Sequence, residues 1–149
     1  MALLLSPAQA GYRAALLLAA TAWPLAAASV QAPNPAGIWL HDEGQYKIQV
    51  SQHAGRWRAT ILVIGPGVPP KDTQNPDLRL RGRDIVGTDM FWNLRWNPGE
   101  GKFTGGTLYA SRFGKHIPAT AWLDDANTLR VQGRVLLMTR TLTFKRTAP

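Results

Sequence analysis

Apolar and polar residues alternate with a period of two along most of the chain from residue 37 onward, most clearly over residues 46–51 and 57–63. That period places successive side chains on opposite faces of a β-sheet. No segment after residue 37 shows the apolar spacing of about 3.6 residues that marks an amphipathic helix. The pattern therefore predicts an all-β protein.

Turn-forming residues divide this pattern into strands. Glycine and proline are concentrated over residues 65–70, which predicts that a strand ends there and that a long loop runs on to Gly82. After this loop, further clusters of turn residues separate predicted strands over residues 85–96, 102–110, 116–123, 128–134 and 136–146. In the first of them, the alternation predicts that Trp92, Leu94 and Trp96 share one face.

About eight antiparallel strands in one small domain favour an up-and-down β-barrel, because closing the sheet removes its unpaired edges. A sandwich of two sheets is the competing architecture. A barrel of about eight strands is wide enough either to be filled by its own side chains or to hold one small ligand. The alternation is compatible with both a filled and a hollow barrel.

The beginning of the chain has the features of a secretory signal peptide. Arg13 precedes an apolar run over residues 14–22, and a stretch of small residues, 26–28, follows Pro24. This order predicts a leader that is cleaved after Ala28 and a protein that is periplasmic or secreted. The apolar run is shorter than the roughly 20 residues that a membrane-spanning helix needs. We therefore divide the chain into a signal peptide, an extended tail and a barrel domain, over residues 1–28, 29–36 and 37–149.

The composition limits the kinds of site and partner. The chain has no cysteine, so disulfides and thiolate metal sites are excluded. Its formal net charge of +8 favours encounters with an anionic ligand or an anionic membrane surface. The basic residues are scattered rather than packed into a tract, so we expect no binding to nucleic acid. We expect the protein to be a monomer.

The first and last predicted strands resemble those of lipocalins. Gly37-Ile38-Trp39 opens the first strand and Lys145-Arg146 ends the last. In lipocalins the tryptophan of a Gly-x-Trp motif closes one end of the barrel, and a basic side chain of the final strand packs across its ring. The resemblance implies that Trp39 is a structural plug rather than a ligand contact.

Nearly the whole chain from Gly37-Ile38-Trp39 to the final strand resembles a bacterial family, and the best motifs lie in the middle. The motifs that carry this resemblance are Asp72-x-x-Asn75-Pro76-Asp77 in the loop, Gly105-Gly106 followed by Tyr109 in a strand, and the turn Gly114-Lys115. Together they are similar to the domain of unknown function 2147, a set of exported proteins with a lipocalin-like barrel. That family has no assigned activity, so the resemblance implies a fold and a compartment.

Three oxygen-bearing side chains, Asp72, Asn75 and Asp77, lie close enough in sequence to suggest a calcium loop. The regular carboxylate spacing and the downstream bidentate glutamate of such a loop are absent. Asn-Pro-Asp is also a strong turn former, so we predict a turn and no metal site. Inside the strand, Gly105-Gly106 predicts a β-bulge or a close approach of backbone.

No arrangement of residues identifies a reaction. The histidines lack the spacing of metal ligands, and Ser51 and Ser111 lack the glycine-flanked turn of a hydrolase nucleophile. Asp77, Tyr109 and His116 are the titratable candidates for an active site, and nothing in their spacing brings them together. We predict a non-enzymatic protein without a cofactor.

Aromatic and basic side chains give the remaining functional signal. An amphipathic anion would suit a barrel mouth whose wall and rim hold Trp57, Trp92, Trp96, Tyr109 and Arg81. Alternatively, the aromatic side chains fill the core, while Arg81 and its neighbours Arg79 and Arg83 keep an edge soluble. These arginines could also meet membrane phosphates.

Two functional hypotheses follow. The first is an exported binding protein that holds a small apolar or amphipathic ligand in a barrel cavity, and it predicts a hollow interior with Trp or Tyr on its wall. The alternative is a structural or interaction protein of the cell envelope that has a filled barrel and acts through the loop over residues 65–83. It predicts an exposed apolar or basic patch in place of a cavity.

Overall fold

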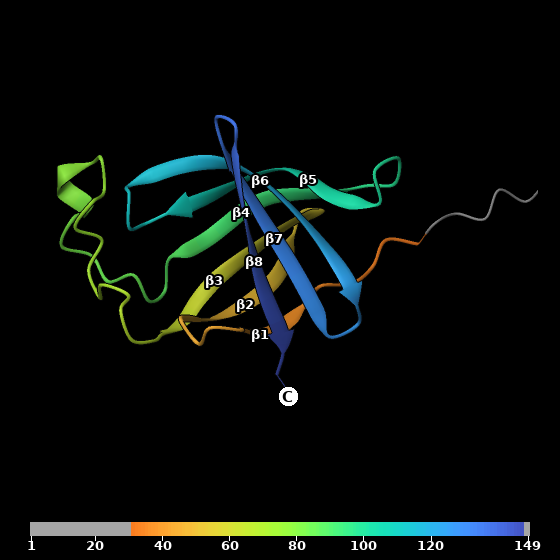
Figure 1. Cartoon of the computed structure of the whole chain (residues 1–149), viewed down its shortest axis with the longest axis horizontal. Coiled ribbons are helices and arrows are strands. Elements are labelled where there is room, and N and C mark those ends of the chain that lie inside the picture. The colour runs from red at the N-terminus through yellow and green to blue at the C-terminus, as the bar shows by residue number, and fades with distance from the viewer. Residues whose placement is uncertain (1–30, 148–149) are drawn as a thin grey trace, which may run out of the picture.

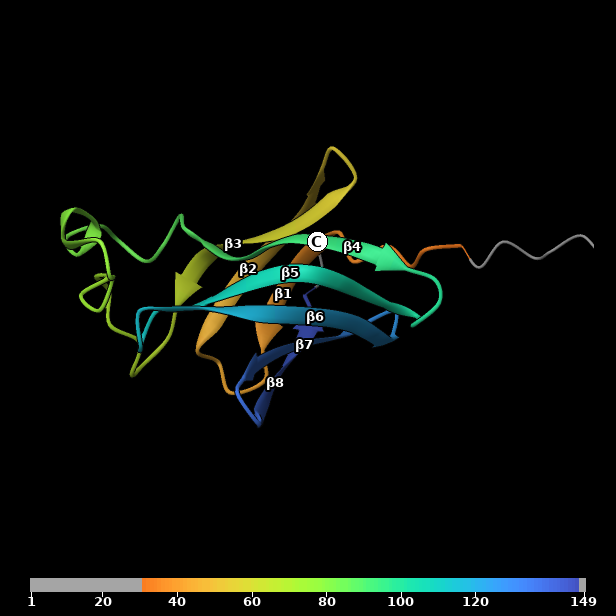
Figure 2. The same cartoon turned by 90° about the horizontal axis from the view of Figure 1, so that it is seen from above.

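The computed structural model describes residues 31–147, which form a closed antiparallel barrel (Figures 1 and 2). Residues 31–36 have no regular secondary structure, and the predicted signal peptide with its cleavage site lies outside the described residues. Within residues 31–147 no helix is long and apolar enough to cross a membrane. The elements are β1 (Gly37–His41), β2 (Tyr46–His53), β3 (Arg56–Ile64), η1 (Leu78–Leu80), β4 (Asp89–Asn97), β5 (Lys102–Ala110), β6 (Lys115–Asp125), β7 (Thr128–Val135) and β8 (Met138–Arg146).

Each strand pairs with its neighbours in sequence, and β8 returns to pair with β1, so the order around the barrel is β1 to β8. The sequence-based expectation of an up-and-down barrel is therefore confirmed, and the sandwich is wrong. Two strand starts differ from the prediction by more than one residue. Residues 85–88 finish the loop with a turn, in which the Thr88 amide donates to the Ile85 carbonyl, and residues 136–137 form the turn between β7 and β8.

The up-and-down order gives the barrel two distinct ends. At the end that we call the closed end, β1 starts and β8 finishes. Trp39 is fully buried there, its Nε1 donates to the Pro35 carbonyl at 2.9 Å, and the Arg146 guanidinium lies 4.2 Å from the ring centroid. The predicted plug is thus confirmed with Arg146 as its cation, whereas Lys145 donates to Thr128 instead.

The interior is filled toward the closed end by a cluster of large side chains. Trp57 packs edge-on to Phe103 with 6.1 Å between ring centroids, and Trp96 packs against the same Phe103 ring with 5.1 Å between centroids. Phe91, Leu94 and Phe144 complete this part of the core. Apolar burial of this kind is the main source of stability in a domain without disulfides.

A backbone irregularity turns Trp92 to the outside of the barrel. Asn93 has φ +63°, so the alternation of β4 shifts between Trp92 and Leu94. Leu94 and Trp96 belong to the core, whereas Trp92 packs against His116 on the outer wall, and the prediction that all three share one face is wrong.

The neighbouring strand, β5, contains the predicted bulge. Gly105 has φ +73°, and the pairing of β5 with β6 shifts register between Phe103 and Gly106. A Cβ atom on Gly106 would lie 2.6 Å from the side chain of Leu94. The backbone of β5 therefore approaches β4 too closely at this position for any residue other than glycine. The interpretation of Gly105-Gly106 is therefore confirmed.

Candidate functional site

The connection between β3 and β4, residues 65–88, projects beyond the strands at the end of the barrel where β3 finishes and β4 begins (Figure 2), and we call it the long loop. A buried carboxylate fixes it there: Asp72 is 1% exposed, and its Oδ1 accepts a 2.6 Å hydrogen bond from the hydroxyl of Tyr109 on β5. Its Oδ2 accepts from Asn75 Nδ2 at 2.7 Å and from Arg83 Nε at 2.9 Å. The carboxylate is thus satisfied on both oxygens and ties the long loop to the barrel wall.

The rest of the Asp-x-x-Asn-Pro-Asp motif serves the backbone of the long loop. Asn75 Oδ1 accepts from the Asp77 amide at 2.9 Å, and Asp77 accepts from the Arg79 amide at 3.0 Å, which caps the short helix η1. The Arg79 side chain also pairs with Asp77, at 2.8 Å. These contacts are the turn geometry expected of asparagine and aspartate side chains.

The network around Asp72 shifts the pKa values of its members. Burial alone would raise the pKa of Asp72, but hydrogen bonds from Tyr109, Asn75 and Arg83, together with the Arg83 charge, hold that pKa below its ordinary value. Burial and the hydrogen bond to the Asp72 carboxylate raise the pKa of Tyr109 to about 12. At neutral pH the pair is therefore a phenol donating to a carboxylate.

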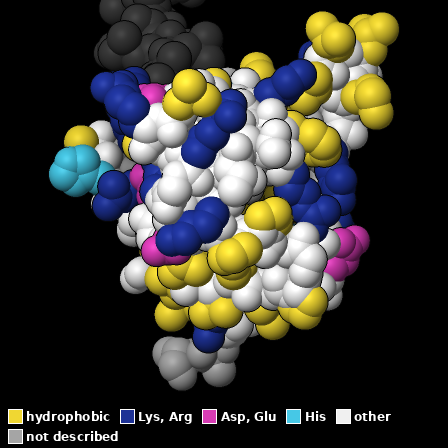
Figure 3. Space-filling view, turned by 90° about the vertical axis from the view of Figure 1, so that its left-hand side faces the viewer, with side chains coloured by type: hydrophobic (Ala, Val, Ile, Leu, Met, Phe, Trp, Pro, Cys, Tyr) yellow, Lys and Arg dark blue, Asp and Glu magenta, His cyan; other side chains and the backbone are white. Residues whose placement is uncertain are grey.

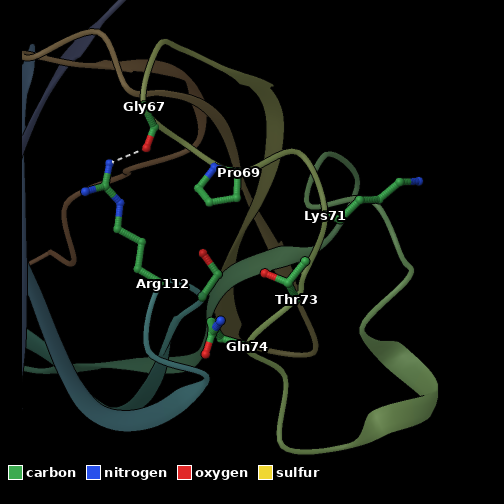
Figure 4. Close-up of a pocket in the computed structure, with 7 residues that line it drawn as sticks. Gly67, Pro69, Lys71, Thr73, Gln74 and Arg112 are labelled. Atoms are coloured by element: carbon green, nitrogen blue, oxygen red, sulfur yellow. Dashed lines mark hydrogen bonds between the residues drawn. The ribbon is translucent and has the colours of Figure 1, made fainter.

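The long loop also contacts the turn between β5 and β6. Gly114 in this turn approaches the Gln74 carbonyl so closely that a Cβ atom would overlap it. Arg112 donates to the Gly67 carbonyl at 2.8 Å across a small hollow of about 230 Å³ (Figure 4). In the same view Lys71 points away from the hollow, and it pairs with Asp84 at 2.7 Å. This hollow lies between the long loop and the β5–β6 turn, and its volume is too small for a drug-sized ligand.

A larger cavity occupies the other end of the barrel, the open end, where the β1–β2, β3–β4, β5–β6 and β7–β8 connections lie. Its volume is about 460 Å³, and we call it the mouth cavity. Its inner wall is mainly apolar and is formed by Tyr46, Met90, Leu108, Ile117, Gly133 and Leu142. The barrel is therefore filled toward its closed end and hollow at its open end.

Gly133 leaves room for the side chains of Ile117 and Leu108 in the wall of the mouth cavity. A Cβ atom there would lie 2.5 Å from Ile117 and 3.0 Å from Leu108, so any side chain would displace the neighbouring wall. The charged residues that line the cavity are Arg112, Lys115 and Arg140, and all three are exposed at its rim. The cavity thus combines an apolar interior with a basic entrance, which is the chemistry of a site for amphipathic anions.

A second hollow, of about 600 Å³, lies between the long loop and the outer wall of the barrel. It brings together the three residues that were considered for an active site, because Asp77, Tyr109 and His116 all line it. His116 stacks on Tyr109 with 4.9 Å between ring centroids. The Tyr109 hydroxyl is engaged by Asp72, and the Asp77 carboxylate by Arg79. Two of the three groups are therefore occupied in holding the long loop.

The five ligand-binding candidates from the sequence do not converge on one site. Trp57 and Trp96 pack in or against the core, Trp92 lies on the outer wall, and Arg81 donates to the Asn75 carbonyl within the long loop. Tyr109 lines both the mouth cavity and the outer hollow. The inner wall of the mouth cavity was not singled out, and its only signal in the sequence is the alternation of the strands that supply it.

Comparisons with known proteins agree with this architecture. The barrel resembles protein HP1028 from the human pathogen Helicobacter pylori, which is described as belonging to the lipocalin family. That comparison has a TM-score of 0.67 and 22% identity, and it covers 78% of this chain and 84% of the other. A search of the curated proteins found no match. Residues 37–146 match the model of the bacterial family described as "uncharacterized protein conserved in bacteria (DUF2147)", and the chain therefore belongs to that family.

Proposed function

We propose that this protein is an exported, non-enzymatic binding protein that holds a small apolar or amphipathic anionic ligand in its mouth cavity. The observation that carries the proposal is the mouth cavity itself. Its volume of about 460 Å³ lies within the range of about 300–1,000 Å³ that is usual for small-molecule sites. Its inner wall offers almost no hydrogen-bonding partners, so it favours an apolar group.

The rim supports an anionic end group on the ligand. Arg112, Lys115 and Arg140 lie around the entrance, and the apolar wall begins directly inside it. A ligand with an apolar body and a carboxylate or phosphate head would bury the first and leave the second beside these cations. The proposed location in the periplasm or outside the cell is supported by the leader-like first residues of the sequence.

The experiment that tests this proposal is native mass spectrometry of the protein recovered from its own host. A small molecule bound at unit stoichiometry and released by denaturation supports the proposal and identifies the ligand class. A clean protein mass, both before and after incubation with a lipid extract of that host, contradicts it.

A fluorescent fatty acid then locates the site. Leu142→Trp enlarges a half-buried side chain on the cavity wall, and we expect it to weaken probe binding by about tenfold or more, because the cavity is filled. Leu123→Trp is the matched control, since Leu123 is also half-buried against the core but does not line the mouth cavity. Equal loss in both variants would place the probe elsewhere.

The long loop supports the second candidate, an interaction protein of the cell envelope. Leu78 and Val86 are exposed on this loop, although Asp72 holds it firmly against the barrel. Such a fixed apolar surface suits contact with another macromolecule. Capture of a partner that is lost in Leu78→Ser, together with a clean mass in the first experiment, would favour this candidate.

A further inference from the structure

The hairpin between β7 and β8 ends in a strongly exposed apolar tip, residues 135–138, which we call the hairpin tip. Leu136 is 89% exposed, Leu137 is 94% exposed and Met138 is 78% exposed. Figure 1 shows this hairpin projecting beyond the rest of the barrel. Exposed apolar side chains are common singly, but consecutive ones at a projecting tip mark a contact surface.

The requirements of folding do not explain these side chains. Leu136 has φ +52° and occupies the first central position of the turn, where glycine is the usual residue. A leucine in this left-handed conformation is strained, because its Cβ atom crowds the backbone. Because the side chain is exposed, it offsets none of this strain by packing within the barrel. The identity of the residue is therefore better explained by something outside the barrel.

Unpaired cations surround the hairpin tip. Arg134 and Arg140 flank it on β7 and β8, and both are exposed. The Arg134 Nε atom donates only to the Leu136 carbonyl of the turn, at 3.4 Å. None of the ion pairs within residues 31–147 involves either arginine. In Figure 3 a yellow projection at the upper right has dark blue Lys and Arg side chains beside and below it.

The hairpin tip belongs to the same rim as the turn between β5 and β6. Val135 and Met138 line the mouth cavity together with Phe113, which is 70% exposed on that turn. Arg112 and Lys115 flank Phe113 as Arg134 and Arg140 flank the tip. Two apolar projections with basic neighbours thus stand at the entrance of one cavity.

We propose that the hairpin tip inserts into the headgroup region of an anionic lipid bilayer, so that the mouth cavity opens toward the membrane. Apolar side chains that enter the boundary of the acyl chains gain burial, and each nearby cation adds electrostatic attraction to anionic lipids. The combination of apolar tip and free cations fits a bilayer, which offers both an apolar interior and negative charge. This inference goes beyond ligand binding and does not require it.

The arginines of the long loop are a poorer fit to the same surface. Arg79 pairs with Asp77, Arg83 pairs with Asp72, and Arg81 donates to the Asn75 carbonyl. Their charges are already directed at partners within the protein. Membrane phosphates are thus better matched by Arg134 and Arg140.

The test is flotation with lipid vesicles. The full chain is expressed in a bacterial host, the accumulated form is purified, and its N-terminus is identified by intact mass so that all variants share it. We expect binding to vesicles of phosphatidylglycerol and phosphatidylethanolamine, weaker binding at high salt, and none to phosphatidylcholine alone. The double variant Leu136→Ser/Leu137→Ser should lower the partition coefficient by about tenfold or more.

Matched variants separate the hairpin tip from general apolar and basic character. Leu78→Ser removes an exposed leucine from the long loop, and Arg79→Gln removes an arginine that already has a partner. We expect neither to change vesicle binding, whereas Arg134→Gln/Arg140→Gln should weaken it. In addition, Leu137→Trp should show a blue-shifted indole emission on anionic vesicles.

Three results would overturn the proposal. The first is equal binding by wild type and by the double serine variant. The second is loss of binding with Leu78→Ser but not with the double serine variant. The third is failure to bind anionic vesicles while sedimentation shows a dimer that the double serine variant dissociates, which would assign the hairpin tip to contact with a second copy.

Discussion

The hydroxyl of Tyr109 on β5 donates a 2.6 Å hydrogen bond to the buried carboxylate of Asp72, 37 positions earlier in the chain. This contact joins the long loop to the barrel wall directly beside the mouth cavity, which Tyr109 also lines. The loop therefore has a fixed position relative to the cavity. A change in this one pair affects both the stability of the fold and the shape of the open end.

Removing the hydroxyl tests the strength of that link. Tyr109→Phe leaves one oxygen of a buried carboxylate without its donor, so we expect a loss of about 1.5–3 kcal/mol in the free energy of unfolding by urea. Amide hydrogen exchange over residues 71–84 should become faster than in the strands. Tyr46→Phe is the control, because no hydrogen bond of the Tyr46 hydroxyl is present in the described part of the chain. A similar loss in both variants would show that the hydroxyl of Tyr109 has no special role.

Acid should weaken the same link. The pKa of Asp72 is lowered in the folded protein, so its contribution to stability is present above the unfolded value of about 3.9 and is lost as the pH falls through the lower folded value. The difference in melting temperature between wild type and Asp72→Asn should therefore be largest near neutral pH and shrink below about pH 4. Asp84→Asn, at an exposed ion pair, should differ little from wild type throughout. A difference that grows in acid would contradict the assignment.

Alkali should act through Tyr109. Its pKa is raised to about 12, above the unfolded value of about 10, so the folded state favours the neutral phenol. The resulting stability is fully present below about pH 10 and is lost as the pH rises toward 12. The melting temperature of wild type should fall over this interval more steeply than that of Tyr109→Phe. The ultraviolet absorbance of the tyrosine phenolate, followed as the pH rises, measures the ionisation of Tyr109 independently.

The plug at the closed end depends on the geometry of a guanidinium group. Arg146 lies 4.2 Å from the ring centroid of Trp39, and it also donates to the carbonyls of Ala126, Ala36 and Asn34. Arg146→Lys keeps the charge but not the fork of donors, and we expect a loss of about 1–2 kcal/mol in stability, with faster exchange of the amides over residues 34–38. The exposed Arg95, changed to lysine in the same way, is the control. Unchanged exchange in Arg146→Lys would mean that the charge alone suffices.

Close contact between the β5–β6 turn and the long loop requires glycine at position 114. Gly114→Ala would place a Cβ atom on the Gln74 carbonyl, and the backbone there also has φ +60°. Gly101→Ala is the matched control, since Gly101 has φ +62° but nothing within 4 Å of the added atom. We expect the first variant to be less stable than the second by about 1–3 kcal/mol in urea unfolding, because only it must displace the loop. Equal effects would assign the whole cost to the backbone conformation.

Local patterns in the sequence predict the fold well because period-two alternation and turn residues act over short distances. The Gly105-Gly106 bulge could be interpreted for the same reason, since it depends on one strand, whereas the role of Trp39 came from the resemblance to lipocalins. The outward orientation of Trp92 could not be predicted, because it depends on the left-handed backbone at Asn93. The alternation of apolar and polar residues continues past Asn93 in the sequence, but the side chains after it no longer point to the faces that the alternation predicts.

The candidate site was harder to predict because its residues come from several strands and meet only once those strands are paired in the barrel. The Gly133 position is defined by its contacts with Leu108 and Ile117, which belong to two other strands. The hairpin tip left a clearer signal. Four consecutive apolar residues, 135–138, interrupt the alternation directly after Arg134, and the predicted strand over residues 136–146 extends into them. Apolar residues in a run are as compatible with an exposed turn as with a buried strand.

Barrel closure also imposes an order on folding. Arg146 holds the backbone of residues that precede it by 110 positions, and the pairing of β1 with β8 is the last seam of the sheet in sequence terms. Contacts between such distant segments carry a large loop-closure entropy and slow the search for the native state. The strands from β2 to β7 can assemble by local hairpins as the chain emerges, but the seam waits until residue 146 is available. A chain of this design keeps its barrel open until its final strand arrives.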